Sequence, residues 1–285
     1  MIQRINAARW VEDHVINLRK LGFQVANKYT GRVLVELHNK RLFAAGLVLV
    51  GTLAFMAWLN ELGIRTAGSS TQDLDLARRQ PMKLAVTVPL LETLKGTDIE
   101  FFGVPGLRPA APSTSAKRLG KDDLRVDLLA NGPELGQSIP VPELRWHAQT
   151  VPHFDYLLQD HQPAAMLAGG HCIPVRLPAL SRMAWHRLYS STRRLVDRAK
   201  AEKDPWQAAV LLAALVDRDS ANLGPSLVEA PEEVQQALRT RRPVLLDLLT
   251  AYPQAQEEVL NAWTVSESPV DCGAVMYGTS LISER

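Results

Sequence analysis

Cysteine is almost missing from this sequence, because its 285 residues include only Cys172 and Cys272. The two lie far apart and in unrelated sequence contexts, so neither a disulfide framework nor a thiolate zinc site is expected. A secretory leader is not expected either, since residues 1–23 mix charges with apolar residues and do not form an apolar core that ends at a cleavage site. These features favour a protein of the reducing cytoplasm.

The chain also lacks a strong charge of either sign, with a formal net charge of +2 at pH 7. Whole-chain charge therefore neither requires nor excludes nucleic acid as a partner, and any basic surface must be local. One segment, between Pro105 and Asp123, is rich in Pro, Ser, Gly and charge and is predicted to be an exposed loop. Its basic residues are Arg108, Lys117, Arg118 and Lys121. They could contact an RNA backbone, or the segment could be an ordinary solvated loop.

Long apolar runs are rare, and a single one, Leu42 to Leu59, requires a membrane test. It is uncharged and about as long as the shortest membrane-spanning helices. However, Gly51-Thr52 divides it into a β-branched run, 47–50, and a helix-like run, 53–62. This division is typical of a buried strand that leads into a buried helix. We therefore expect no membrane span, with membrane anchoring as the alternative.

Helical and strand patterns surround this strand-turn-helix unit. Two amphipathic helices, 6–21 and 30–42, precede it and could form a helical cover. After it, Leu74 and Leu76 alternate with Asp73 and Asp75, as in a strand with one apolar and one acidic face. Further strands are predicted at 99–102 and 124–130. The stretch 139–177, with a hairpin turn at Gly169-Gly170, is predicted to form the edge of the sheet.

From Pro178 onward the periodicity is helical. One helix is predicted from Ser181 to Lys203, and the next begins at Asp204-Pro205, with Asp204 as its N-cap. Two more follow at 230–251 and 254–265. The predicted fold class is α+β, a small mixed β-sheet flanked by helices and followed by a helical lobe. The expected domains are residues 1–178 and 179–285.

The strongest chemical signal is the acidic strand. Residues two apart on a strand project from one face, so Asp73 and Asp75 place two carboxylates side by side and favour a neutralising cation. Asp127, inside the apolar run 124–130, adds a third carboxylate on another strand. Magnesium, as one or two ions, suits such a set in phosphoryl transfer. The alternative is that the two aspartates are only the solvated face of an edge strand.

The turn before the helix suits a phosphate. Gly51 allows a close backbone approach, and Thr52 presents a hydroxyl and backbone donors at the positive end of a helix. Farther along, the predicted helix 181–203 carries Arg187, Ser190, Ser191, Arg194 and Arg198 at steps of three to four residues. These side chains share a broad face that suits a triphosphate, or that is simply solvated.

The ordered segments VLVGTLAF, STQDLDLA and RVDLLA resemble the nucleotidyltransferases of the DNA polymerase β superfamily. The resemblance is closer to bacterial nucleotidyltransferase-like proteins related to AbiE-type abortive-infection toxins, and it continues through a Pro-bounded strand, a basic helix and a Lys-Asp-x-x-Gln-Ala signature. It covers roughly residues 47–216. It implies a magnesium-dependent enzyme that moves a nucleoside monophosphate from a nucleoside triphosphate (NTP) to a hydroxyl. The acceptor could be RNA, especially the tRNA 3′ end, or a protein or small molecule.

The resemblance and the residue patterns together assign site residues. The metal ligands are Asp73, Asp75 and Asp127; the other catalytic residues are Arg187 and Asp204; the nucleotide-binding residues are Gly51, Thr52, Ser69, Ser70, Thr71, Ser190 and Arg194. Related toxins often have lysine at the position of Arg187, so only the electrostatic role carries over. Asp204 has two interpretations, site residue or N-cap, and His186 is expected to be a packing residue. The alternative function is a catalytically inactive binding or regulatory partner in a defence or toxin-antitoxin system.

Overall fold

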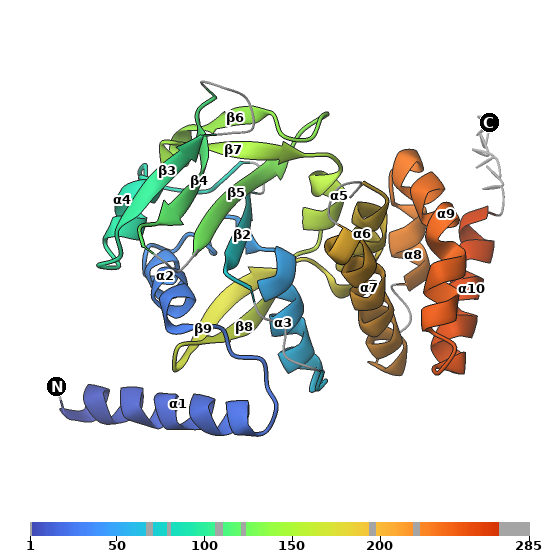
Figure 1. Ribbon diagram of the computed structural model, residues 1–285, viewed down its shortest axis with the longest axis horizontal. Helices are drawn as coiled ribbons and strands as arrows, with labels where there is room; N and C mark the ends of the chain where they lie inside the picture. Colours follow the sequence, from blue (N-terminus) through green and yellow to red (C-terminus); the bar gives the residue numbers. More distant parts are fainter. Residues whose placement is uncertain are drawn as a thin grey trace, which may run out of the picture.

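A computed structural model describes residues 2–66, 71–78, 81–105, 111–120, 124–193, 198–218 and 223–267. Ser69, Ser70, Arg108, Lys121, Arg194 and Cys272 lie outside these ranges. Within them the fold is α+β, as predicted: a mixed sheet with helices around it, followed by helices alone (Figure 1).

The main sheet has seven strands in the described residues, and β5 lies at its centre. Its path runs β1-β2-β5-β4-β3, with β7 also paired to β5 and β6 paired to β7. Leu74, Leu76, Val126 and Leu128 are fully buried on one face, which is the period-two pattern expected of half-buried strands. The strands are β1 Leu47–Leu49, β2 Asp73–Arg78, β3 Phe101–Pro105, β4 Ser113–Arg118, β5 Arg125–Asn131, β6 Ser138–Val141 and β7 Trp146–Val151.

The helix that follows β1, α3 Gly51–Leu62, is buried on nearly every side, from Leu53 to Leu59. This confirms a buried strand that leads into a buried helix. None of the helices in the described part of the chain is long and apolar enough to cross a membrane. The shorter elements around the sheet are α2 Lys28–Asn39, α4 Leu90–Lys95, η1 Pro142–Leu144 and α5 Phe154–Leu158.

The predicted loop between Pro105 and Asp123 is wrong in part, because residues 113–118 form β4 between β3 and β5. Thr114, Ser115 and Ala116 are buried there. Apart from Thr114, the segment lacks the β-branched and aromatic residues that favour strands, so pairing with β3 and β5 creates this strand where local sequence favours a turn.

The hairpin turn at Gly169-Gly170 is confirmed, with φ of +53° and +86°. It joins β8 Gln162–Ala168 to β9 His171–Leu177. The prediction that the whole stretch 139–177 forms the sheet edge is wrong, since β6 and β7 join the main sheet whereas β8 and β9 form a separate two-stranded sheet. An apolar period identifies a strand but does not identify its partner.

Five helices complete the described chain: α6 Leu180–Arg193, α7 Arg198–Arg218, α8 Leu223–Val228, α9 Glu232–Leu248 and α10 Pro253–Glu267. Their core contains Trp185 and Trp263, whose rings meet edge to face at 5.4 Å. The indole of Trp185 donates a hydrogen bond to Ser226 Oγ at 3.1 Å. Figure 1 shows α6 and α7 next to α3, with α8, α9 and α10 beyond them.

The predicted N-cap at Asp204 is wrong. Asp204 and Pro205 lie inside α7, which begins at Arg198. Asp204 is buried and forms an ion pair with Arg187 of α6. The local signal of an Asp-Pro pair is therefore overridden by packing between two helices.

The first helix, α1 Ile2–Lys20, is loosely attached. Val15 is its one buried side chain among those described, and Ile5, Trp10 and Ile16 are exposed. Figure 1 shows α1 running beneath β8 and β9, away from the main sheet. By contrast, α2 buries Val33, so the expected helical cover is mainly α2.

Candidate functional site

The turn between β1 and α3 is built around a contact between a glycine and a carboxylate. Gly51 has φ +67°, and a Cβ built on it would lie 1.9 Å from Oδ2 of Asp75. Only glycine therefore permits both this backbone conformation and this contact. The carboxylate of Asp75 lies against the first residue of α3, where the positive end of the helix favours a negative group.

Backbone pairing fixes this arrangement. The N–H of Val50 donates to the carbonyl of Asp75 at 3.0 Å, which joins the end of β1 to β2. In the parallel pairing of β2 with β5, Asp75 lies opposite Asp127 and Asp73 lies opposite Arg125. Residues opposite each other in parallel strands project to the same face, so the three predicted carboxylates share one face of the sheet.

Asp127 is held by a cation and a hydroxyl. Its Oδ1 accepts a hydrogen bond from Arg125 Nε at 2.8 Å and a short one from Ser115 Oγ. Arg125 Nη2 in turn donates to Ser115 Oγ at 2.7 Å. Arg125 and Ser115 were missed by the sequence analysis. The period-two rule could have identified Arg125, which lies two residues before Asp127 on the same strand face.

The carboxylates do not form a closed metal cage. The described residues contain no group of three or more His, Cys, Asp or Glu side chains that could hold an ion. Asp73 and Asp75 still fit magnesium by donor chemistry, because this ion is usually bound by one or two carboxylates, with waters and substrate phosphates as the other ligands.

Thr71 approaches the acidic strand from its start. Its Oγ1 accepts a hydrogen bond from the N–H of Asp73 at 3.1 Å. Thr52 is half-buried in the first turn of α3. The turn therefore has a predicted hydroxyl residue at the start of its helix and another at the start of its acidic strand. Ser69 and Ser70 precede Thr71 but lie outside the described residues.

Arg187 connects the helical region to the same turn. Its Nη2 donates a short hydrogen bond to the carbonyl of Gly51, and its Nη1 lies 3.1 Å from Oδ1 of Asp204. Both Arg187 and Asp204 are buried. The structure thus brings Gly51, Arg187 and Asp204 together in one chain of contacts across α3, α6 and α7.

The described part of the broad basic face predicted for residues 181–203 is not a solvated face. Arg187 and Ser191 are buried, and Ser190 is half-buried, with Oγ 3.4 Å from His186 Nδ1. His186 packs against Phe154 at 5.2 Å between ring centroids, in agreement with a packing residue. Residues 194–197 lie outside the described part of the chain, and so does the side chain of Arg198.

Gln207 is the glutamine of the Lys-Asp-x-x-Gln-Ala signature, and the sequence patterns assign it no role. It is fully buried in α7, three residues after Asp204, and neither its amide nitrogen nor its amide oxygen has a hydrogen-bond partner among the described residues. Residues three apart share a helix face, so Gln207 and Asp204 lie on one side of α7.

The profile of a nucleotidyltransferase family matches residues 28–232, which is more than two thirds of the chain. The chain belongs to this family. It is therefore a transferase of phosphorus-containing groups with a nucleotide substrate. Neither the search of curated proteins nor the search of solved structures gave a match.

The match places the site inside the nucleotidyltransferase region. Gly51, Asp75, Asp127, Arg187 and Asp204 all lie within residues 28–232. The helices α1 and α10 lie outside this range. The residues that form the turn and its contacts therefore belong to the matched region, the nucleotidyltransferase core, and α1 lies outside it.

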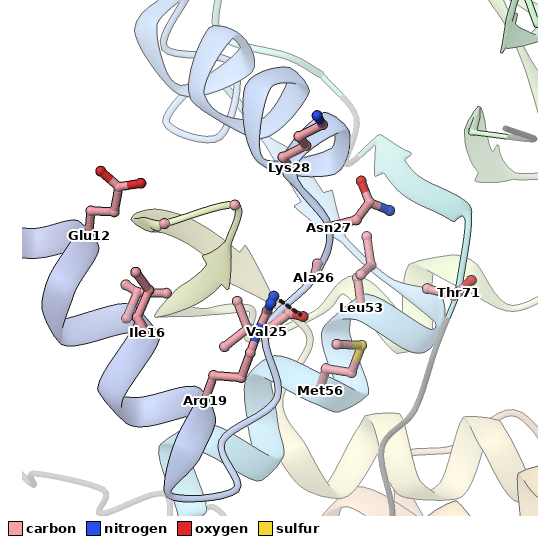
Figure 2. A pocket seen from close by; sticks show the side chains of 13 residues that line it. Glu12, Ile16, Arg19, Val25, Ala26, Asn27, Lys28, Leu53, Met56 and Thr71 are labelled. Carbon is pink, nitrogen blue, oxygen red and sulfur yellow. Dashed lines mark hydrogen bonds between the residues drawn. The ribbon is translucent and has the colours of Figure 1, made fainter.

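A pocket of about 550 Å³ opens between this nucleotidyltransferase core and α1. Figure 2 shows Glu12, Ile16 and Arg19 of α1 on one side, and Leu53, Met56 and Thr71 on the other. Its remaining lining residues are Val15, Val25, Ala26, Asn27, Lys28, Gly169 and Gly170. Thr71 belongs both to this wall and to the start of the acidic strand.

Proposed function

We propose that this protein moves a nucleoside monophosphate from a magnesium-bound NTP to a hydroxyl acceptor, with pyrophosphate as the leaving group. One observation carries the proposal: Asp75 lies against Gly51 at the start of α3. This contact places a carboxylate beside a helix N-terminus, so a metal-bound phosphate can meet both. Family membership supports the same class of reaction.

Each predicted residue has a role in this proposal. Asp73 and Asp75 would hold magnesium, which neutralises phosphate charge and aligns the attacking oxygen. Asp127 ligates the metal or accepts the proton of the acceptor hydroxyl. Phosphate oxygens contact α3 backbone N–H groups and the hydroxyl of Thr52. The remaining proposed nucleotide contacts are Ser69, Ser70, Thr71, Ser190 and Arg194.

Arg187 and Asp204 act on the turn in this proposal. The guanidinium of Arg187 fixes the Gly51 carbonyl and adds positive charge near the triphosphate, and Asp204 holds the guanidinium in place. A fixed charge of this kind stabilises charge that develops in the transition state without reorganisation.

The proposed acceptor is RNA, in particular the tRNA 3′ end. This choice is supported only by the resemblance to AbiE-type toxins, and a bacterial defence or toxin-antitoxin setting is part of the same proposal. Lys117 and Arg118, at the end of β4, could contact an RNA backbone. The acceptor is tested directly by supplying total RNA, purified tRNA and tRNA that lacks its 3′-terminal adenosine.

The test is label transfer from each α-labelled NTP, with magnesium, to these acceptors. Asp75→Asn removes the carboxylate charge at nearly constant volume and is expected to lower transfer at least about a hundredfold. Asp98→Asn makes the same change at a residue whose side chain is 92% exposed, and it should transfer label like the wild type. Transfer that survives Asp75→Asn contradicts the site.

A second outcome would support the alternative function. The catalytically inactive partner predicts that NTP binds but that no RNA, protein or small acceptor receives label. The engaged carboxylate of Asp127, bound by Arg125 and Ser115, is the observation that favours this alternative. If this alternative holds, Asp127→Asn binds NTP like the wild type, and neither protein transfers label.

A further inference from the structure

The pocket beside α1 is chemically mixed. Its core side has the apolar side chains of Leu53 and Met56, and α1 adds Ile16. Two charged side chains of α1, Glu12 and Arg19, also line the pocket (Figure 2). Its volume of about 550 Å³ lies within the range of small-molecule sites, about 300–1,000 Å³, and such sites combine apolar walls with a few polar groups.

The wall formed by the start of α2 and the β8-β9 hairpin is fixed by backbone contacts. Ala26 pairs with Ala168 of β8, and its N–H donates to the carbonyl of Leu167 at 2.9 Å. A Cβ at Gly169 would lie 2.6 Å from Lys28 Cα, and one at Gly170 would lie 3.1 Å from Glu12 Cγ. The hairpin turn therefore packs tightly on α2 and α1. This wall of the pocket is preformed, which lowers the cost of ordering on binding.

The pocket adjoins the proposed phosphate site. Leu53 lies in the first turn of α3, one residue after Thr52. Thr71 lies on the same wall, and its Oγ1 accepts a hydrogen bond from the N–H of Asp73. A triphosphate at the start of α3 would therefore leave its nucleoside within reach of this pocket.

We propose that the pocket holds the base and ribose of the NTP, and that Glu12 and Arg19 of α1 select the base. This inference rests on the proposed function and adds a determinant from outside the matched family range, which begins at residue 28. The flat base lies on Leu53 and Met56, and its polar edge faces α1.

The polar groups suit the edge of a base. Arg19 is exposed and donates through Nη2 to the carbonyl of Val25 at 3.3 Å, which orients its planar guanidinium at the pocket. This fork can donate two bonds to a ring nitrogen and an adjacent oxygen. Glu12 accepts from exocyclic amino groups. The oxygen of Asn27 caps α2, so its amide nitrogen is the end that can donate to ribose or base.

The test compares binding of NTPs with binding of inorganic tripolyphosphate, both measured by calorimetry in the presence of magnesium. Arg19→Ala is expected to weaken the preferred NTP roughly tenfold or more and to reduce discrimination among the four NTPs. Tripolyphosphate has no nucleoside, so its affinity should not change. Lys20→Ala is the matched control, because Lys20 is exposed on α1 beside Arg19 but does not line the pocket.

A second pair of variants, one that fills the pocket and one control, leaves the charge unchanged. Ile16→Trp, at a residue that is 45% exposed at the pocket, should weaken NTP binding and leave tripolyphosphate binding intact. Asn17→Trp, at the next and exposed helix position, should leave both intact. Thermal unfolding of all four variants reports whether α1 and the core stay folded.

The outcomes separate this inference from the proposed function. A wild-type protein that binds no NTP contradicts the proposed function, and with it this inference. Normal NTP binding by wild type, Arg19→Ala and Ile16→Trp alike contradicts this inference alone. Equal loss of NTP and tripolyphosphate binding in the two variants also contradicts it, because α1 would then act on the phosphate site and not on the nucleoside.

Discussion

Gly51 and Asp75 meet so closely that a side chain at position 51 would displace the Asp75 carboxylate. The Cβ of any other residue at position 51 would overlap the Asp75 carboxylate. This contact explains why a small residue follows the apolar strand and why the acidic residue lies at the third position of β2. The proposed site is therefore defined by a glycine that follows β1 and a carboxylate from within β2.

Gly51→Ala is expected to abolish nucleotidyl transfer and to destabilise the fold. Gly63→Ala is the control, since Gly63 also has φ +67° but a Cβ there meets nothing within 4 Å. The backbone cost of about 1–2 kcal/mol applies to both variants, and the displacement of Asp75 applies only to the first. Urea unfolding and label transfer measure the two effects. Equal transfer by both variants would contradict the role of the contact.

Glu143→Gln is expected to flatten the acid dependence of stability. Burial opposes ionisation of Glu143, but backbone hydrogen bonds and the Arg78 guanidinium at 2.8 Å outweigh it and hold the pKa below its ordinary value of 4.5. A carboxyl with a lowered folded-state pKa stabilises the fold above its ordinary pKa, and this contribution is lost as the pH falls through the lowered value.

The measurement is urea unfolding of wild type and Glu143→Gln from about pH 7, where the contribution is complete, to about pH 3, below the ordinary pKa where it is being lost. The wild type should be the more stable protein at the neutral end, and the difference should shrink toward the acid end. Asp98→Asn, at an exposed residue, should follow the wild type at every pH. A constant difference across the range would contradict the explanation.

At the scale of elements, α6 and α7 hold the start of α3. Arg187 reaches from α6 to the Gly51 carbonyl and to Asp204 of α7. The sequence predicted a charged residue at this position for a triphosphate. It could not predict the ion pair, because the two residues come from different helices and both are buried.

Arg187→Met is expected to destabilise the protein by about 3–5 kcal/mol, because Asp204 loses the cation of a buried pair. Arg187→Lys keeps the charge and should lose less stability. Arg193→Met, at a half-exposed arginine of the same helix, should change stability by less than about 1 kcal/mol. Chemical denaturation measures the stability of all three variants. Equal stability of Arg187→Met and Arg193→Met would contradict a stabilising role for the buried Arg187–Asp204 ion pair.

Helices and strands were predictable from the sequence where apolar residues recur at regular helical or strand spacing. The strand 47–50, its helix, the acidic strand and the hairpin at Gly169-Gly170 follow from residue patterns alone. The strand β4 did not, because Ser113–Arg118 has a loop-like composition and becomes a strand only by pairing with β3 and β5. The N-cap at Asp204 failed for the same reason, since the tertiary ion pair overrode a local signal.

At the scale of the whole molecule, the C-terminal helices contact α3 beside the proposed site. Phe55 of α3 lies 6.0 Å from Trp206 of α7 between ring centroids, and Gly51 accepts from Arg187. The described strands all end by Leu177, near the predicted boundary of 178 and 179. That boundary, and two separate domains, remain a prediction.

A fragment of residues 1–178 tests whether the two predicted domains are independent. Because Phe55 and the Gly51 turn lose their partners in α6 and α7, the fragment is expected to unfold at a lower temperature than the full chain and to bind no NTP. Circular dichroism melting and calorimetry measure this. A fragment that melts as cooperatively and at the same temperature as the full chain would contradict this dependence on α6 and α7 and support independent domains.

The most direct test of the central claim compares two labels in one NTP. With Asp75 of β2 against the start of α3, α-phosphate label should pass to the acceptor, and γ-phosphate label should leave in pyrophosphate. Transfer of the α label and release of the γ label in pyrophosphate should fall together in Asp75→Asn and persist in Asp98→Asn. Transfer of the γ label to the acceptor, or α-label transfer that Asp75→Asn leaves unchanged, would contradict nucleotidyl transfer at this site.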